Sequence, residues 1–181
     1  MAEPSAALRA VTLRGEEAAL VAVQSALADR PGVLAGARAL SHFGEHSIGW
    51  LAVAAVGALL QPKRRNAWLA AGAGAFLAHA AAVVIKRVVR RERPHHPSIA
   101  VNVGTPSRLS FPSAHATSTT AASILLGRAT GLPLPAALVP PMALSRLVLG
   151  VHYPSDVLTG VVVGAAVAKV ISAVADRVEG V

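Results

Sequence analysis

The sequence predicts an all-α integral membrane protein, a helical bundle of about five transmembrane helices preceded by amphipathic interfacial helices. Its 181 residues are 54% hydrophobic and only 14% charged, whereas a soluble domain carries about 25% charged residues. The apolar runs use most of the length and leave no room for a separate soluble domain. There is no cysteine, which excludes disulfides and thiolate metal sites.

The start of the chain, residues 1–45, is expected to form a leader and interfacial helices ahead of a transmembrane domain over 46–176. Residues 1–15 resemble a loose polar leader. Residues 16–29 begin with two acids and place apolar side chains at helical spacing, which predicts an amphipathic helix. This stretch is too short to cross a hydrocarbon core of about 30 Å, so it should lie along the interface. A second short helix is expected over 33–42.

Five apolar segments follow this start and are interpreted as membrane spans. If all of them cross, four segment ends share one membrane face. These are the end of the second segment, the start of the third, the end of the fourth and the start of the fifth. The strongly polar residues of the core occur at these four places, which predicts one site on that face. The segments are about 46–60, 67–86, 114–130, 133–150 and 155–174.

Some histidines lie apart from this site in the sequence. His42, Glu45 and His46 could hold a metal ion, but a turn at the membrane interface is the preferred interpretation. His79 lies within the second span and is expected to pack inside the bundle.

The cations of the predicted site suit an anion with several oxygens. Lys86, Arg93 and Arg146 come from three chain segments, and arginine forks match phosphate geometry. Ser113 is expected to cap the third span, whose free backbone N–H groups would add a second anion-binding feature. His115 lies within reach of the same anion.

A pair of histidines could carry out the chemistry. Asp156, in the first turn of the fifth span, could hold the imidazole of His152 by one nitrogen and leave the other free to react. Two histidines on opposite sides of a phosphate, His152 and His115, provide a nucleophile and an acid. Glu92 and Asp156 are the only acids in the polar core, too few for a usual Mg²⁺ site, so no metal or cofactor is expected.

Three motifs resemble the signatures of the type 2 phosphatidic acid phosphatase (PAP2) superfamily, which includes vanadium haloperoxidases. The resemblance covers about residues 45–175 and implies the PAP2/haloperoxidase-like helical core and a phosphatase activity. The second motif departs in one place, since Ala114 stands where glycine is usual. The motifs are Lys86-x6-Arg93-Pro94, Pro112-Ser113-Ala114-His115 and Ser145-Arg146-x5-His152-x3-Asp156.

The resemblance also implies a role for each motif residue. His152 would form a phosphohistidine, Asp156 would orient it, and His115 would protonate the leaving alcohol. The flanking Arg90, Arg91, His95, His96 and Arg108 are as readily explained by solvent or headgroup contacts. The phosphate-binding residues would be Lys86, Arg93, Ser113, Ala114 and Arg146.

The resemblance implies a polyprenyl-linked or other lipid phosphate as the substrate. The sequence around the motifs resembles that of PAP2 members that act on a polyprenyl-phosphoryl-pentose 5-phosphate, which is therefore the expected substrate. Alternatives are polyprenyl diphosphate, phosphatidic acid or phosphatidylglycerol phosphate, or a non-enzymatic protein that binds anionic lipids. Nucleic acid is not an expected partner, because aromatic residues are only 3%. Small residues on the second and fifth spans, among them Gly160 and Gly164, would allow self-association or packing within one bundle.

The expected location is the plasma membrane, with the chain crossing it several times. Net charge is +8, and more basic residues fall on the site face than on the opposite face, which favours a cytoplasmic site. Besides the site cations, the site face has Arg9, Arg14, Arg30, Arg38, Arg87, Arg90, Arg91 and Arg108, and the opposite face has Lys63, Arg64, Arg65, Arg128 and Arg177.

Overall fold

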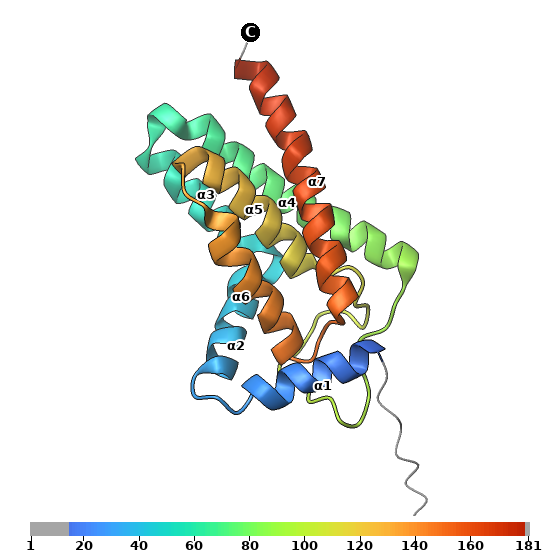
Figure 1. Cartoon of the computed structure of the whole chain (residues 1–181). Coiled ribbons are helices and arrows are strands. Elements are labelled where there is room, and N and C mark those ends of the chain that lie inside the picture. Colours follow the sequence, from blue (N-terminus) through green and yellow to red (C-terminus); the bar gives the residue numbers. More distant parts are fainter. Residues whose placement is uncertain (1–14, 180–181) are drawn as a thin grey trace, which may run out of the picture.

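A computed structural model describes residues 15–179 and shows a helical bundle, with no β-strand in this part of the chain (Figure 1). The all-α prediction is confirmed. Residues 1–14 of the expected leader, with Arg9 and Arg14, lie outside the described residues. The elements are α1 (Gly15–Leu27), α2 (Val33–Gly44), the 3₁₀ turn η1 (Glu45–Ser47), α3 (Ile48–Leu60), the 3₁₀ turn η2 (Pro62–Arg64), α4 (Arg65–Val89), α5 (Ala114–Thr130), α6 (Leu134–Val148) and α7 (Pro154–Glu179).

Helices α2 and α3 form one long apolar segment with a bend between them. The bend lies in η1, where His46 and Ser47 have φ angles of 48° and 62°. The 13 residues of α3 rise about 20 Å, less than a bilayer core of about 30 Å, and α2 supplies the missing length. Helix α2 contains the helix expected over 33–42, and the combined segment Val33–Leu60 is long and apolar enough to cross a membrane.

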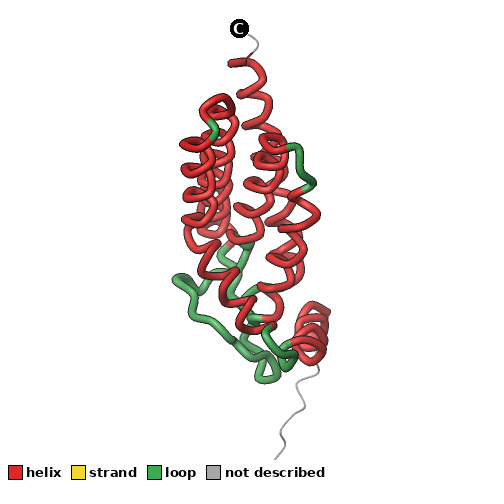
Figure 2. The backbone as a smooth tube through the Cα atoms, turned by 90° about the vertical axis from the view of Figure 1, so that its left-hand side faces the viewer, coloured by secondary structure: helices red, strands yellow, loops and turns green. Residues whose placement is uncertain are grey.

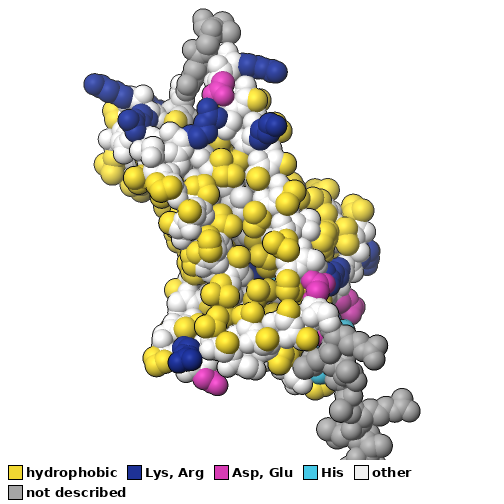
Figure 3. Space-filling model, in the orientation of Figure 1, with side chains coloured by type: hydrophobic (Ala, Val, Ile, Leu, Met, Phe, Trp, Pro, Cys, Tyr) yellow, Lys and Arg dark blue, Asp and Glu magenta, His cyan; other side chains and the backbone are white. Residues whose placement is uncertain are grey.

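Three segments are long and apolar enough to cross a membrane: Val33–Leu60, Pro62–Val89 and Pro154–Arg177. Helices α5 and α6 are shorter, with 17 and 15 residues. Large apolar side chains such as Leu60 and Val88 are about three-quarters exposed, as expected of surfaces that face lipid. Figure 3 shows hydrophobic side chains over the middle of the molecule and Lys and Arg toward its two ends.

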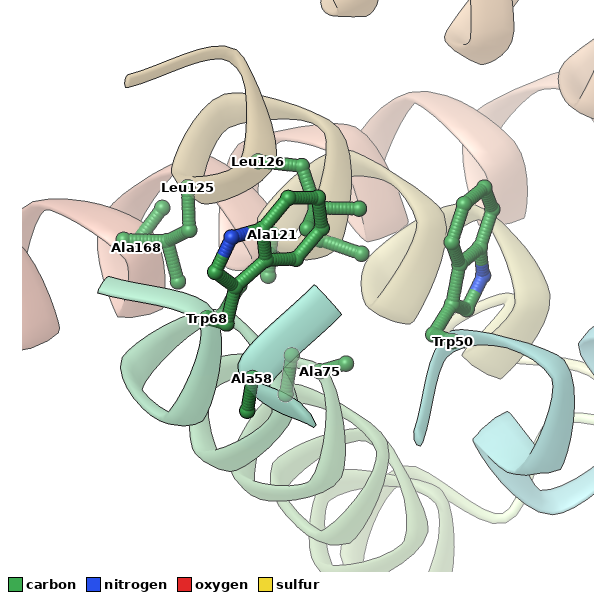
Figure 4. Packing of buried hydrophobic residues seen from close by; sticks show 11 residues of the cluster. Trp50, Ala58, Trp68, Ala75, Ala121, Leu125, Leu126 and Ala168 are labelled. Carbon is green, nitrogen blue, oxygen red and sulfur yellow. The ribbon is translucent and has the colours of Figure 1, made fainter. Parts of the chain in front are cut away.

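Helix α5 is the centre of the bundle and packs against α4, α6 and α7. The largest core cluster joins α3, α4, α5 and α7 through alanines, leucines and two tryptophans (Figure 4). Trp50 and Trp68 belong to this cluster, and Trp50 Nε1 donates a hydrogen bond to Thr119 Oγ1 at 3.2 Å. The many small residues in this cluster allow the helices to approach closely.

The glycines of α7 allow a close approach to α5. A Cβ atom on Gly160 would meet the carbonyl oxygen of Ser113, and one on Gly164 would meet that of Thr117. The small-residue face of the fifth span is therefore used inside the bundle.

The four helix ends that the sequence places on one face do lie together, at the end of the bundle away from the C-terminus. The long segment 90–113 between α4 and α5 covers this end, and Figure 2 shows it as an extended loop. Helix α1 crosses the same end (Figure 1). The α3–α4 and α5–α6 connections lie at the other end.

Candidate active site

A cavity of about 390 Å³ lies at this end of the bundle. It opens between the ends of α4, α5 and α6, the segment 90–113 and the α6–α7 loop. Two predicted site residues, Ser113 and Asp156, are buried behind the cavity wall and do not line it. The six that line it are Lys86, Arg93, Ala114, His115, Arg146 and His152.

His152 lies in the α6–α7 loop with its side chain only 3% exposed. Its Nε2 is 3.2 Å from Nη1 of Arg93, and its Nδ1 is 3.6 Å from Oδ2 of Asp156, one turn further along. Burial lowers the pKa of His152 well below its usual range, and the nearby cations Arg93 and Lys86 lower it further. The imidazole is therefore neutral at neutral pH, and one ring nitrogen has a lone pair to offer.

Backbone carbonyls hold the first two cations in place. Arg93 donates from Nε to the carbonyl oxygen of Ser107 at 2.8 Å and from Nη1 to that of Val151 at 2.6 Å. Burial lowers the pKa of Arg93 to about 10, which leaves it charged at neutral pH. Lys86 donates from Nζ to the carbonyl oxygens of Leu109 and Pro112, at 2.9 and 3.0 Å.

The third site cation, Arg146, has one hydrogen-bond donor that is unpaired within the described residues. Its side chain comes from the last turn of α6 and is 2% exposed. Nε donates to Ser145 Oγ at 3.2 Å, whereas Nη2 is buried with no hydrogen-bond partner among the described residues. Buried donors are nearly always paired, so an unpaired guanidinium nitrogen at a cavity indicates an anionic ligand.

The start of α5 brings the second motif to the cavity. Ser113 is the N-cap, as predicted, and its Oγ accepts a hydrogen bond from the Ala116 backbone N–H at 3.4 Å. Its own backbone N–H donates to the carbonyl oxygen of Asp156 at 2.9 Å, which ties the second motif to the third. His115 reaches across to α2, with Nε2 2.9 Å from the carbonyl oxygen of Ser41.

Two of the residues that flank the motifs, Arg91 and His96, make contacts within the protein. Arg91 contacts Asp156 rather than only solvent or headgroups, with Nη1 3.0 Å from Oδ1. His96 is 8% exposed, and its Nδ1 accepts a hydrogen bond from the Ser98 backbone N–H. The others, Arg90, His95 and Arg108, are exposed.

The cavity also has residues that were not predicted to belong to it. Glu45, His46 and His79 form part of its wall, although His79 was expected to pack inside the bundle. Glu45 Oε1 and His46 Nδ1 are 3.8 Å apart. Within residues 15–179, no three His, Asp or Glu side chains are grouped as a metal site would require.

Sequence comparison decides the family. The PAP2 superfamily profile matches residues 67–179. The chain belongs to the PAP2 superfamily. Two solved structures are similar to the chain. The first transmembrane PAP2 type phosphatidylglycerolphosphate phosphatase from Bacillus subtilis matches with a TM-score of 0.71 and 19% identity, over 93% of this chain and 90% of that chain. Aquifex aeolicus LpxE matches with a TM-score of 0.64 and 16% identity, over 88% of this chain and 95% of that chain. At these identities they show the shared PAP2 fold.

Closely related PAP2 sequences come from mycobacteria. The chain is 82% identical over 147 residues to the decaprenylphosphoryl-5-phosphoribose phosphatase of Mycolicibacterium smegmatis. This alignment covers 81% of this chain and 82% of that protein. It is 71% identical over 161 residues to the Mycobacterium tuberculosis protein of the same name, covering 89% and 91%. The chain is thus a PAP2 membrane phosphatase, a phosphoric monoester hydrolase.

Proposed function

We propose that the chain removes the 5-phosphate of decaprenylphosphoryl-5-phosphoribose, giving decaprenylphosphoryl-ribose for cell-wall arabinan synthesis. Relatives named for this substrate match more than four-fifths of the chain at 71–82% identity. The observation that carries the proposed chemistry is the placement of His152. It is a buried imidazole whose Nε2 faces Arg93 in a cavity that Lys86 and Arg146 also line.

In the first step, the Nε2 lone pair of His152 attacks phosphorus and forms a P–N bond. The bond from phosphorus to the ribose oxygen breaks, and His115 gives that oxygen its proton. Asp156 lies on the Nδ1 side, so it favours the tautomer with its proton on Nδ1. The 3.6 Å separation would shorten to a hydrogen bond as positive charge develops on the ring.

In the second step, water attacks the phosphohistidine and the P–N bond breaks. His115, now neutral, takes a proton from the water, and inorganic phosphate leaves with the site restored. Lys86, Arg93 and Arg146 stabilise the charge on the phosphoryl oxygens in both steps, together with the N–H groups at the start of α5. All of these groups belong to the chain, and we propose that no metal takes part.

We propose a cytoplasmic site in the plasma membrane. Support comes from the positive-inside rule and from the basic residues at the cavity end. Within the described residues these are, besides the site cations, Arg30, Arg38, Arg87, Arg90, Arg91 and Arg108. An accessibility tag placed before residue 15 would test the orientation, because α1 lies at the cavity end. Labelling of that tag in intact cells by an impermeant reagent would contradict a cytoplasmic site.

Phosphate release by the purified protein tests the activity. The parent should release phosphate from decaprenylphosphoryl-5-phosphoribose with EDTA present, and His152→Ala should lose at least about 10³-fold in kcat. His42→Ala is the matched control, because His42 is exposed and does not line the cavity. Unchanged release by His152→Ala would refute the nucleophile assignment.

A substrate panel separates this proposal from its alternatives. It would contain polyprenyl diphosphate, phosphatidic acid and phosphatidylglycerol phosphate at matched detergent ratios. A higher kcat/KM on any of these than on the phosphoribose lipid would reject the proposed substrate while keeping the chemistry. Binding of all four without release would support the anionic-lipid binder instead.

A further inference from the structure

Arg91 connects the aspartate of the third motif to the N-terminal helix. Its Nη1 lies 3.0 Å from Oδ1 of Asp156, and its Nη2 lies 2.6 Å from Oε2 of Glu16 in α1. Nη1 also donates to Ser155 Oγ at 2.7 Å. One guanidinium therefore holds two carboxylates that are 140 positions apart in the sequence.

The local backbone explains why Arg91 and Arg93 act on neighbouring groups. Glu92 pairs with Leu109 in an isolated antiparallel bridge, so this stretch is extended. Side chains two positions apart on an extended stretch point to the same side. Arg93 thus meets His152 while Arg91 meets Asp156, and the guanidinium of Arg91 also lies 4.0 Å above the ring of Tyr153.

Glu16 has a second contact at the same place. Its Oε1 accepts a hydrogen bond from the backbone N–H of Ser155 at 2.7 Å, in the first turn of α7. That N–H has no partner within the helix, and a carboxylate there also suits the helix dipole. Burial opposes the charge on Glu16, but hydrogen bonds from Arg91 and Ser155 lower its pKa overall.

Other contacts fix α1 on the bundle independently of Glu16. Leu20 is fully buried. Gln24 Nε2 donates to the carbonyl oxygens of Ala100 and Val148, at 2.6 and 3.1 Å, and Gln24 Oε1 accepts from the Ala100 backbone N–H at 3.1 Å. The orientation of Glu16 is thus set by a docked helix.

We infer that Glu16 and Arg91 are positioning residues for the phosphatase reaction, and that α1 completes the active site by fixing Asp156 through Arg91. Glu16 lies outside residues 67–179, so the PAP2 match does not include this contribution. The inference rests on the proposed function. Asp156 also receives a hydrogen bond from the Tyr153 backbone N–H at 2.8 Å, and Arg91 fixes its other oxygen.

The test compares Glu16→Gln, Arg91→Lys, Arg91→Met and the Glu16→Gln/Arg91→Met pair with the parent. A misplaced catalytic group costs up to about 10²-fold in rate. We expect kcat to fall about tenfold in Glu16→Gln and about 10²-fold in Arg91→Met, with KM within threefold. Arg91→Lys should recover part of the loss, and the pair should be no slower than Arg91→Met alone.

The matched control is the exposed ion pair at the other end of the bundle, Arg128 Nη2 with Asp176 Oδ1 at 2.7 Å. Arg128→Met and Asp176→Asn should leave kcat within twofold of the parent. Gln24→Ala separates docking from positioning, because it weakens the attachment of α1 and should lower the melting temperature. The inference would be overturned if kcat of Glu16→Gln fell only in step with a lowered melting temperature of that variant.

A spectroscopic readout keeps this test separate from the proposed function. The ¹⁵N-edited NMR signal of the His152 ring should shift in Glu16→Gln and Arg91→Met but not in the control variants. A shift together with an inactive parent would reject the proposed function and keep the positioning role. An unchanged signal, or unchanged kcat in both variants of an active parent, would overturn the positioning role.

Discussion

Arg93 Nη1 lies 3.2 Å from His152 Nε2, although 59 positions separate the two residues in the sequence. The contact places a fixed cation beside the nitrogen that we propose as the nucleophile. A phosphoryl group bound by Arg93 would therefore be held next to the attacking atom, and such positioning lowers the barrier to phosphoryl transfer.

The buried imidazole of His152 should make folding stability depend on pH. Burial lowers the pKa of His152 in the folded protein, whereas the unfolded chain keeps a value of about 6.5. The unfolded state therefore binds the extra proton first, and this contribution to stability is complete above about pH 6.5 and is lost as the pH falls below it. Melting temperatures in detergent between pH 7.5 and 5 should fall less for His152→Gln than for the parent. Parallel curves for the two proteins would contradict this.

Lys86 should contribute through its charge to phosphate binding. Lys86→Met keeps the length of the side chain but removes the cation that Leu109 and Pro112 hold in position. A hydrogen bond to a charged group is worth about 1.5–3 kcal/mol, so kcat/KM should fall by about 10- to 10²-fold. Lys63→Met, at the opposite end of the bundle, should retain the parent value. Equal losses in the two variants would mean that the effect is not local to the site.

Gly44 leaves the space that His115 occupies. A Cβ atom at Gly44 would lie 2.7 Å from Cδ2 of His115 and 3.3 Å from Cε of Met142, too close without a shift. Gly44→Ala should therefore displace the proposed acid and lower kcat by about 10- to 10²-fold. Gly36→Ala, in the same helix with nothing within 4 Å of the new atom, is the control and should remain fully active. Normal kcat in a folded Gly44→Ala protein would argue against His115 as the acid.

The close approach of α7 to α5 should be sensitive to the side-chain volume at the glycines of α7. Gly164→Ala places a methyl group against the Thr117 carbonyl and 2.8 Å from the Cβ of Thr120. Overpacking of this kind costs about 1–3 kcal/mol, which should lower the melting temperature in detergent. Val162→Leu adds volume on the exposed side of α7 and should leave the melting temperature unchanged. A Gly164→Ala protein as stable as the parent would show that the helices separate at little cost.

Local sequence signals predicted much of the fold. The expected span 114–130 coincides with α5, because Ser113 caps its start and Gly131, with a φ of 78°, ends it. The turn expected around His42, Glu45 and His46 corresponds to the bend in η1, but the positive φ angles of His46 and Ser47 were not predicted, since they depend on packing around these residues rather than on their own preferences.

The site was predictable where its residues belong to motifs at helix ends. Six of the eight expected residues line one cavity, because the topology brings four helix ends together. The link from Glu16 to Arg91 was not predictable, since it depends on where α1 docks, and no local pattern encodes a contact across 75 positions. The roles of the eight residues remain predictions.

The most direct test of the central claim, that His152 is the nucleophile, is to trap and map the phosphoenzyme. Rapid quenching of the parent with ³²P-labelled substrate, followed by mass spectrometry, should locate an acid-labile, base-stable phosphate on His152, with none in His152→Ala. Phosphate on another residue, or turnover by His152→Ala at the parent rate, would contradict the claim.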